Sequence, residues 1–427
     1  MSILSGYKDT AAKLDSEDKL GKFREEFFDS GEKLIYLDGN SLGKMPIRSG
    51  ERVRYLLDKE WGSDLIRGWN ASWWDMPQRA ASKISSVIGA SENEVIVSDS
   101  TSLNLYKLVK AALRLKSERR KIVCESISFP TDLYIIQGVI DQLADNYHLV
   151  LAESEDGISV SLDELESLVD DNTALVVLSL VSYRSAAMYD MQKVNDLVHQ
   201  KGALVIWDLS HAAGAVPLSL KATGADMAVG CTYKYLNCGP GSPAYLYVRE
   251  DLIESSKSPI WGWFGELRPF DFSKSYRPSN SIKKFMTGTS GIMSMCTIEP
   301  SLDIIGEAGM DRIREKNIGL TSFFVKMTEA LLYPHGFSLG SPDNPELRGS
   351  HVSVRHREAF RISKALIDPE CGSYVIIPDF RPPDILRLGF SALYNSYMEV
   401  YRTVEELLFI IENEAYTGYS SEREDVT

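Results

Sequence analysis

Two charged residues follow consecutive apolar runs in the middle of the chain. Asp208 closes the run ALVIWD (203–208), and Lys234 follows the next run, DMAVG (226–230). Ligands of open α/β sheets bind beyond the carboxyl ends of the strands, so both side chains are expected to face one site. An enzyme that uses pyridoxal phosphate needs such a pair: the lysine forms a Schiff base, and the carboxylate keeps the pyridine nitrogen protonated. Alone, the pair fits a surface lysine and a helix-capping aspartate better; with the flanking residues below, the cofactor site is favoured.

Small polar residues follow an earlier apolar run, EVIVS (94–98). Asp99, Ser100, Thr101 and Ser102 come directly after it and open a helical stretch. Free N–H groups and the helix dipole at such a position attract an anion, which makes this segment a candidate phosphate site. A plain helix N-cap uses the same residue types. The segment gains weight because it precedes Asp208 and Lys234 in the order that the cofactor site needs.

Three further segments carry side chains suited to binding a flat cofactor or a carboxylate. In SISFPTDLY, Phe129 is suited to stacking on an aromatic ring and Asp132 to orienting it; a core phenylalanine and a helix cap fit equally well. Arg387 lies inside the apolar run ILRLGF, where a guanidinium must be paired. Its partner is either a substrate carboxylate or an internal carboxylate. In MTGTSG, Thr289 and Ser290 stand at a helix start, which is again either an anion site or a cap.

The elements that position these residues alternate along the chain from about residue 94. Helical stretches separate near-continuous apolar runs, which predicts a mainly parallel sheet covered on both faces, in an α/β domain. The runs are 94–98, 121–126, 148–153, 174–182, 203–208, 226–230 and 243–248. After about residue 290 the pattern predicts a smaller α+β lobe. Its elements are helices over 292–330, strands at 351–355, 374–379 and 385–390, a helix near 357–367, and a last helix near 396–413.

This pattern divides the chain into four parts. We predict an N-terminal segment at 1–50 that packs on the small domain and a large pyridoxal-phosphate-binding α/β domain at 51–291. A small C-terminal α+β domain follows at 292–413, and residues 414–427 are expected to form a flexible tail.

The composition of the chain limits which classes of molecule it is expected to bind and in which cellular compartment it is expected to lie. The 427 residues carry a formal charge of −14, which disfavours nucleic acid and anionic membrane surfaces. The N-terminus has no apolar signal-peptide core, and no apolar run reaches the length of a membrane span. The five cysteines fit neither a disulfide framework nor a zinc site, and the six histidines are scattered. We therefore expect free thiols, no bound metal and a cytoplasmic location.

Several motifs together closely resemble the kynureninase family, which belongs to the aspartate-aminotransferase-like, fold-type I group of pyridoxal-phosphate enzymes. They are YLDGNSLG (36–43), SFPTDLY (128–134), WDLSHAAGAVP (207–217), GCTYKYLNCGPGSPAYLYV (230–248), GWFG (262–265), RGSHVSV (348–354) and LRLGFSALYNSY (386–397). The resemblance extends from about residue 30 to 413. It implies a fold-type I architecture with pyridoxal phosphate as the cofactor.

The resemblance also implies a role for individual positions. Lys234 resembles the lysine that binds the cofactor and moves protons, Asp208 the partner of the pyridine nitrogen, and Phe129 the ring stacked on it. Asp132 and His211 are expected near the ring substituents. The expected phosphate ligands are Thr101, Ser102, Tyr233, Trp263 and, from a partner subunit, Thr289. Arg387 resembles the arginine that binds the substrate α-carboxylate; Asn40, Glu266 and Ser290 complete the expected substrate-binding set.

The reaction implied by the resemblance is hydrolysis of L-kynurenine, or 3-hydroxykynurenine, to anthranilate and L-alanine, a step of tryptophan catabolism. Lys234 would move the proton at Cα, and Tyr233 is the candidate base for the water that adds to the γ-carbonyl. Because Thr289 is expected to reach the neighbouring site, the resemblance implies a homodimer with shared active sites that acts on a small amino acid.

The substrate end departs from the family pattern. Glu266 stands where the family has histidine, LVSY (180–183) replaces an HVNY-like strand end, and GTSG (288–291) stands where the aryl pocket is lined. A related enzyme that acts on another β- or γ-functionalised amino acid, by decarboxylation, elimination or transamination, is therefore a second hypothesis. A third is a cofactor-binding protein without catalysis; the complete set of Lys234, Asp208 and Arg387 argues against it.

Overall fold

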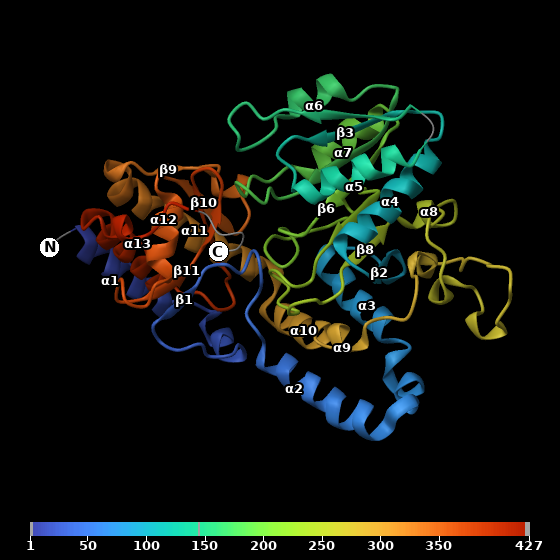
Figure 1. Ribbon diagram of the computed structural model, residues 1–427, viewed down its shortest axis with the longest axis horizontal. Coiled ribbons are helices and arrows are strands. Elements are labelled where there is room, and N and C mark those ends of the chain that lie inside the picture. The colour runs from blue at the N-terminus through green and yellow to red at the C-terminus, as the bar shows by residue number, and fades with distance from the viewer. Residues whose placement is uncertain (1–2, 144–145, 423–427) are drawn as a thin grey trace.

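The computed structural model describes residues 3–143 and 146–422 of the chain. Figure 1 shows a large lobe built around one sheet and a smaller lobe beside it, with the N-terminal helix in the smaller lobe. The α/β class predicted from the alternating runs is confirmed. No helix within the described ranges is long and apolar enough to cross a bilayer.

The large lobe is organised by a seven-stranded sheet of order β2-β8-β7-β6-β5-β3-β4. The strands are β2 (Val95–Val97), β3 (Lys121–Glu125), β4 (His148–Ala152), β5 (Thr173–Ser179), β6 (Leu204–Asp208), β7 (Met227–Gly230) and β8 (Tyr245–Val248). The pairs from β4 through β3, β5 and β6 to β7 are parallel, and β8 is antiparallel to both of its neighbours. Each apolar run from residue 94 to 248 therefore forms a strand of one mainly parallel sheet.

Helices cover both faces of this sheet, and the strand sequences show why. In β6, Val205 and Trp207 belong to the hydrophobic core on one face, whereas Leu204 and Ile206 belong to the core on the other. A strand buried on both faces must be apolar at every position, which is the pattern expected of a parallel sheet. The covering helices are α3 (Met76–Ile88), α4 (Thr101–Leu115), α5 (Pro130–Asp141), α6 (Leu162–Leu168) and α7 (Met191–Gln200), and α10 (Ile298–Ala308) packs against α3.

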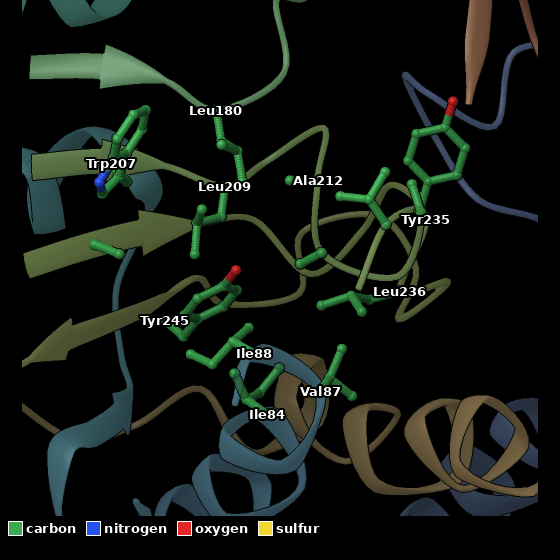
Figure 2. Close-up of a cluster of buried hydrophobic side chains, with 14 of the residues drawn as sticks. Ile84, Val87, Ile88, Leu180, Trp207, Leu209, Ala212, Tyr235, Leu236 and Tyr245 are labelled. Atoms are coloured by element: carbon green, nitrogen blue, oxygen red, sulfur yellow. The ribbon is translucent and has the colours of Figure 1, made fainter. Parts of the chain in front are cut away.

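One of these cores packs directly behind the candidate site. Figure 2 shows Ile84, Val87 and Ile88 of α3 pointing toward the strands and loops that carry Leu209 and Tyr245. Trp207, next to Asp208, is fully buried in the same core. The carboxyl end of β6 is thus held by close packing.

Trp207→Phe is expected to lower the free energy of unfolding by about 2 kcal/mol, because it removes the hydrogen-bond donor to a buried amide oxygen. The indole Nε1 donates to Oδ1 of Asn195 at 2.9 Å, and Asn195 is fully buried. Denaturant titration measures this loss. The exposed Phe409→Ala serves as the control and should change stability by less than about 1 kcal/mol; equal effects would contradict the assignment.

The small lobe contains a four-stranded antiparallel sheet of order β12-β13-β10-β9. Its strands are β9 (Ser338–Leu339), β10 (His351–Arg355), β12 (Asp379–Arg381) and β13 (Ile385–Gly389), and its main helices are α11 (Met310–Met327), α12 (Ala359–Ile367) and α13 (Tyr397–Glu412). The sequence pattern predicts one strand over 374–379, and this is wrong. The run divides at Pro378, which has no N–H for a ladder, into β11 (Val375–Ile377) and β12.

The N-terminal segment lies against the small lobe. The helix α1 (Ile3–Ser16) packs on α13, and β1 (Leu34–Tyr36) pairs in parallel with β11. The chain then enters the large lobe through α2 (Ile47–Tyr55), which continues as π-helical and 3-10 turns to Trp73. Two short helices, α8 (Glu250–Ile253) and α9 (Ile292–Met295), complete the set.

The predicted tail at 414–427 is only partly covered by the structure. Residues Ala415–Gly418 form a 3-10 turn, and Arg361 of α12 donates to the carbonyl oxygens of Thr417 and Tyr419 at 2.6 and 2.9 Å. These contacts fasten the start of the predicted tail to the small lobe. Its last five residues, 423–427, lie outside the described residues.

Candidate active site

A cavity of about 330 Å³ opens where the strands β3, β5, β6 and β7 end. Residues from both lobes and from the N-terminal segment line it. The lining residues are Asn40, Ser41, Thr101, Ser102, Phe129, Thr131, Asp132, Ser179, Tyr183, Asp208, Ser210, His211, Tyr233, Lys234, Arg381 and Arg387. Residues that are far apart in the sequence therefore surround one cavity at the carboxyl edge of the sheet. Most of the site residues predicted from the sequence are among them.

Lys234 and His211 form the basic side of this cavity. Nζ of Lys234 lies 2.8 Å from Nε2 of His211. Burial lowers the pKa of His211 well below its ordinary value, and the charges of Lys234 and His351 lower it further. A neutral imidazole beside Lys234 can accept a hydrogen bond from the lysine without adding a second positive charge.

Asp208 and Asp132 form the acidic side. Asp208 ends β6, and its Oδ1 accepts a hydrogen bond from the backbone N–H of Ser210 at 2.8 Å. Asp132 is buried, and its Oδ2 has no hydrogen-bond partner in the described structure. Burial raises the pKa of Asp132 well above its usual value, and the nearby charges of Asp208 and Glu125 raise it further. Asp132 therefore holds a proton more tightly than an ordinary aspartate does.

Glu125 is a third acid behind the cavity, at the end of β3. It is fully buried and accepts hydrogen bonds from the N–H of Ser179 at 3.1 Å and the hydroxyl of Tyr189 at 2.8 Å. These bonds tie the end of β3 to the end of β5. Burial raises the pKa of Glu125 to about 7 despite these donors.

Glu125→Gln is expected to weaken the pH dependence of stability. The unfolded acid loses its proton near pH 4.5 whereas the folded one keeps it to about pH 7, so the stabilisation is complete below pH 4.5 and is lost as the pH rises through 7. The full loss corresponds to about 3 kcal/mol. Denaturant titrations at pH 5 and pH 8 measure it, with the exposed Glu166→Gln as the control. A decline as steep in Glu125→Gln as in the unchanged protein would contradict this account.

Arg387 stands on the small-lobe side of the cavity and is nearly fully buried. Its Nη1 donates to the carbonyl oxygen of Tyr183 at 2.5 Å, and its Nη2 donates to the hydroxyl of Ser41 at 3.0 Å and to Asp379. The internal ion pair considered from the sequence is therefore present. Arg387 also lines the cavity. The same side chain can therefore pair with Asp379 and still face a ligand.

A second cavity, of about 460 Å³, adjoins the first and shares Thr101, Ser102 and Tyr233 with it. Thr101 begins the 15-residue helix α4, and its hydroxyl is buried without a partner in the described structure. Asp99 also lines this cavity; although burial favours its neutral form, the buried Lys107 holds its pKa below the usual range. The site has the free N–H groups of a helix start and a neutralised acid, which suits a phosphate.

The residues present fit pyridoxal phosphate on four counts. A helix start with an unpartnered hydroxyl at Thr101 suits the phosphate, and the strand-end carboxylate of Asp208 suits the pyridine nitrogen. The buried, unpartnered atoms Oδ2 of Asp132 and Nδ1 of His211 suit polar ring substituents. Lys234 lies in the same cavity, where a covalent bond to the cofactor would form.

Of the remaining residues predicted for the site, four line one of the two cavities and two do not. Phe129 lines the first cavity, with its ring 5.2 Å from that of Tyr183 and perpendicular to it, and Asn40 lines it too. Thr289 and Ser290 line the second cavity within the same chain. All four are therefore placed near Lys234 or the helix start of α4.

Trp263 and Glu266 do not line either cavity. The indole Nε1 of Trp263 donates to the carbonyl oxygen of Pro269 at 2.9 Å, and its ring packs against Trp74 and Phe270. Glu266 pairs with Arg277 at 2.9 Å. Within a single chain, neither residue reaches the cofactor cavity.

The sequence pattern missed several residues that shape the site. Ser41 contacts Arg387, Glu125 lies behind Asp132, and Arg381 lines the cavity beside Arg387. The motif DFR, with Asp379 and Arg381 two positions apart, places two opposite charges on one face of a strand. That spacing is a signal that could have identified Arg381.

Comparison with protein families and curated proteins gives one consistent family. The family model for the kynureninase C-terminal domain matches residues 313–407. A kynureninase of Pseudomonas fluorescens is 42% identical over 408 residues, covering 94% of this chain and 95% of that protein. A kynureninase of Burkholderia mallei (strain SAVP1) is 40% identical over 415 residues, covering 96% of each chain.

Solved structures with low identity show the same fold. A cysteine desulfurase from Thermococcus onnurineus NA1 matches with a TM-score of 0.79 at 19% identity, covering 92% of this chain and 98% of that one. A lysine-to-alanine mutant of the C-DES protein, with glycine covalently linked to its pyridoxal-phosphate cofactor, matches with a TM-score of 0.77 at 14% identity, covering 90% and 98%. The predicted fold-type I architecture is confirmed.

Proposed function

Because this chain belongs to the kynureninase family, we propose that it hydrolyses the Cβ–Cγ bond of L-kynurenine, or of 3-hydroxykynurenine, to give anthranilate or its hydroxylated form and L-alanine. The observation that carries the proposal is the single cavity that brings Lys234, Asp208 and Arg387 together. A catalyst of this reaction needs a proton carrier, an electron sink and a carboxylate anchor, and these residues supply the parts.

Pyridoxal phosphate, when bound, supplies the electron sink that makes the substrate Cα–H acidic and later lets the Cβ–Cγ bond break. Lys234 binds the cofactor and then holds or returns the proton at Cα. Asp208 keeps a proton on the pyridine nitrogen, and the hydrogen bond from Ser210 fixes its carboxylate. The start of α4, with Thr101 and Ser102, holds the phosphate. Phe129, which lines the cavity, would cover one face of the cofactor ring.

Tyr233 lines both cavities, which supports the proposal that it handles the water. Burial raises the pKa of Tyr233, and the neighbouring Cys231 and Asp208 raise it further. The phenol is therefore protonated at neutral pH. Its role in this account is to orient the attacking water and pass a proton, since it carries no standing negative charge.

The departures at the substrate end are compatible with kynurenine. Glu266 is committed to Arg277 and does not line the cavity within one chain, so its charge does not face the substrate there. Identity of 40–42% over nearly the whole chain does not favour a different β- or γ-functionalised substrate. Ser290 and Gly291 line the second cavity and leave room beside the phosphate site.

A homodimer with shared active sites is part of the proposal. Trp261, Phe270 and Phe272 are 67, 62 and 75% exposed on the segment that follows α8, which extends away from the sheet in Figure 1. Soluble monomers rarely expose large apolar patches, and a second copy of the chain would cover these rings. Trp263 lies on the same segment, and a dimer is the arrangement in which it could reach a phosphate. Light scattering should give twice the 47.7 kDa chain mass.

The substrate proposal is tested by turnover of L-kynurenine and 3-hydroxy-L-kynurenine by the cofactor-loaded protein, followed by the fluorescence of the aromatic product. We expect turnover of at least one of these two compounds. The reaction is proposed as a cytoplasmic step of tryptophan catabolism. A change in the cofactor absorption with some other amino acid, together with no turnover of either compound, would overturn the proposed substrate and retain the cofactor.

A further inference from the structure

Two arginines and two aspartates form a charged cluster at the small-lobe end of the 330 Å³ cavity. Asp379 of β12 stands opposite Arg387 of β13 in the sheet register and ion-pairs with it. The same carboxylate lies 3.0 Å from Arg381. Asp38 is the fourth member, and its backbone bridges to Gly389 at the end of β13. One carboxylate, Asp379, is thus shared between two guanidinium groups.

The two arginines retain capacity for a further anion. Both line the cavity, and Nε of each is buried without a hydrogen-bond partner in the described part of the chain. With Asp379 ionised, the group of Arg381, Arg387 and Asp379 carries one net positive charge. A ligand carboxylate would neutralise that charge and use donors that the protein leaves unused.

Asp38 competes for the same positive charge. Its Oδ1 is buried and has no hydrogen-bond partner among the described residues. Asp379 opposes its ionisation; Arg387, Arg381 and the hydroxyl of Ser41 favour it. Burial, the largest cause, raises the pKa of Asp38 to about 7. The phenols of Tyr36 and Tyr235 also face this carboxyl group, and burial raises the pKa of both, so neither is charged near neutral pH.

We propose that Asp38 takes up a proton when the α-carboxylate of the substrate binds between Arg387 and Arg381. A third carboxylate against two arginines would leave one excess negative charge in a buried cluster, and such an uncompensated charge is costly. Protonating Asp38 removes it. Asp38 is therefore a positioning residue: it touches neither substrate nor cofactor and acts through the charge that the two arginines present. The inference rests on the proposed role of Arg387 as the carboxylate anchor.

The direction of the pH effect follows from the linkage of the two equilibria. Below pH 7 Asp38 already holds its proton, and binding of a carboxylate is at its strongest. Above pH 7 a proton must be taken from solution, so affinity falls with rising pH, by up to about tenfold per pH unit.

The test uses desamino-kynurenine, which keeps the carboxylate and the aryl ketone but lacks the amine that reacts with the cofactor. Calorimetric titration of the cofactor-loaded protein at pH 8, in phosphate and in Tris, counts the protons taken up, because the two buffers differ in heat of ionisation. We expect close to one proton for the unchanged protein. Asp38→Asn mimics the neutral acid, so it should take up none and bind about tenfold more tightly at pH 8.

Glu406→Gln is the matched control, because Glu406 is another buried acid with a raised pKa in the small lobe. It accepts hydrogen bonds from Ser373 and Tyr374 and does not line the cavity. This variant should take up one proton like the unchanged protein. Proton uptake is measured first on the unchanged protein. This result does not depend on whether either variant folds.

Binding without proton uptake by the unchanged protein would overturn the inference. Equal proton uptake by Asp38→Asn would overturn it as well, because another group would then carry the proton. Absence of binding would overturn both the carboxylate site and the proton uptake. Turnover of L-kynurenine, measured separately, distinguishes these failures from failure of the proposed function.

Discussion

Lys234→Ala is expected to lower the turnover of L-kynurenine by at least about 10⁴-fold, the upper range for a positioned general acid–base group. The variant loses the nitrogen that, in the proposed function, binds the cofactor and carries the proton at Cα. The residue lies in the cavity 2.8 Å from His211 and supports no core packing, so the fold should persist.

Covalent attachment of the cofactor to the chain distinguishes a direct role of Lys234 from a purely structural one, because a structural role would not affect it. After reduction with borohydride, the unchanged protein should keep the cofactor mass on its chain, whereas Lys234→Ala should not. Lys201→Ala, at an exposed position after α7, is the matched control and should retain both attachment and turnover. A retained visible band of lysine-bound cofactor in Lys234→Ala would contradict the assignment.

Asp208→Asn is expected to lower kcat by about 10³-fold, the upper end of the range for one preorganised electrostatic group. Asparagine can still accept the hydrogen bond from the Ser210 N–H, so the end of β6 should keep its shape. The variant loses the negative charge that we propose holds a proton on the pyridine nitrogen. The loss should fall on kcat far more than on KM, because the charge acts on the developing carbanion.

Two observations check this assignment. The absorption spectrum of the bound cofactor should change its pH dependence in Asp208→Asn, since the pyridine nitrogen loses its anionic partner. The exposed Asp196→Asn on α7 should leave spectrum and rate unchanged. Full activity in Asp208→Asn would remove this residue from the mechanism.

The fold and the cofactor end of the site could be predicted because their signals are local. A parallel strand buried on both faces is apolar throughout, so runs such as 203–208 show where each strand ends. The ligand side of such a sheet is its carboxyl edge, which makes the residue after each run a candidate. Asp208, Phe129 and Thr101 were identified in this way, and the structure places all three at one cavity.

The substrate end depends on contacts between distant segments, which no local pattern contains. Asp38, Asp379 and Arg387 come from the N-terminal segment and two strands of the small lobe, and only folding brings them together. Pro378 marks the division of 374–379 into β11 and β12 locally, but the different partners of the two strands, β1 and β13, are set only by folding. The places of Trp263 and Glu266 in the proposed dimer depend on a second chain, which the sequence of one chain does not position.

The most direct test of the central claim is hydrolysis of L-kynurenine in water enriched in ¹⁸O by the cofactor-loaded protein. Hydrolysis of the Cβ–Cγ bond places the oxygen of water in the carboxylate of anthranilate and leaves the three-carbon fragment as L-alanine. The account predicts labelled anthranilate and L-alanine in equal amounts, by mass spectrometry. Unlabelled aromatic product, or consumption of kynurenine without alanine, would contradict it.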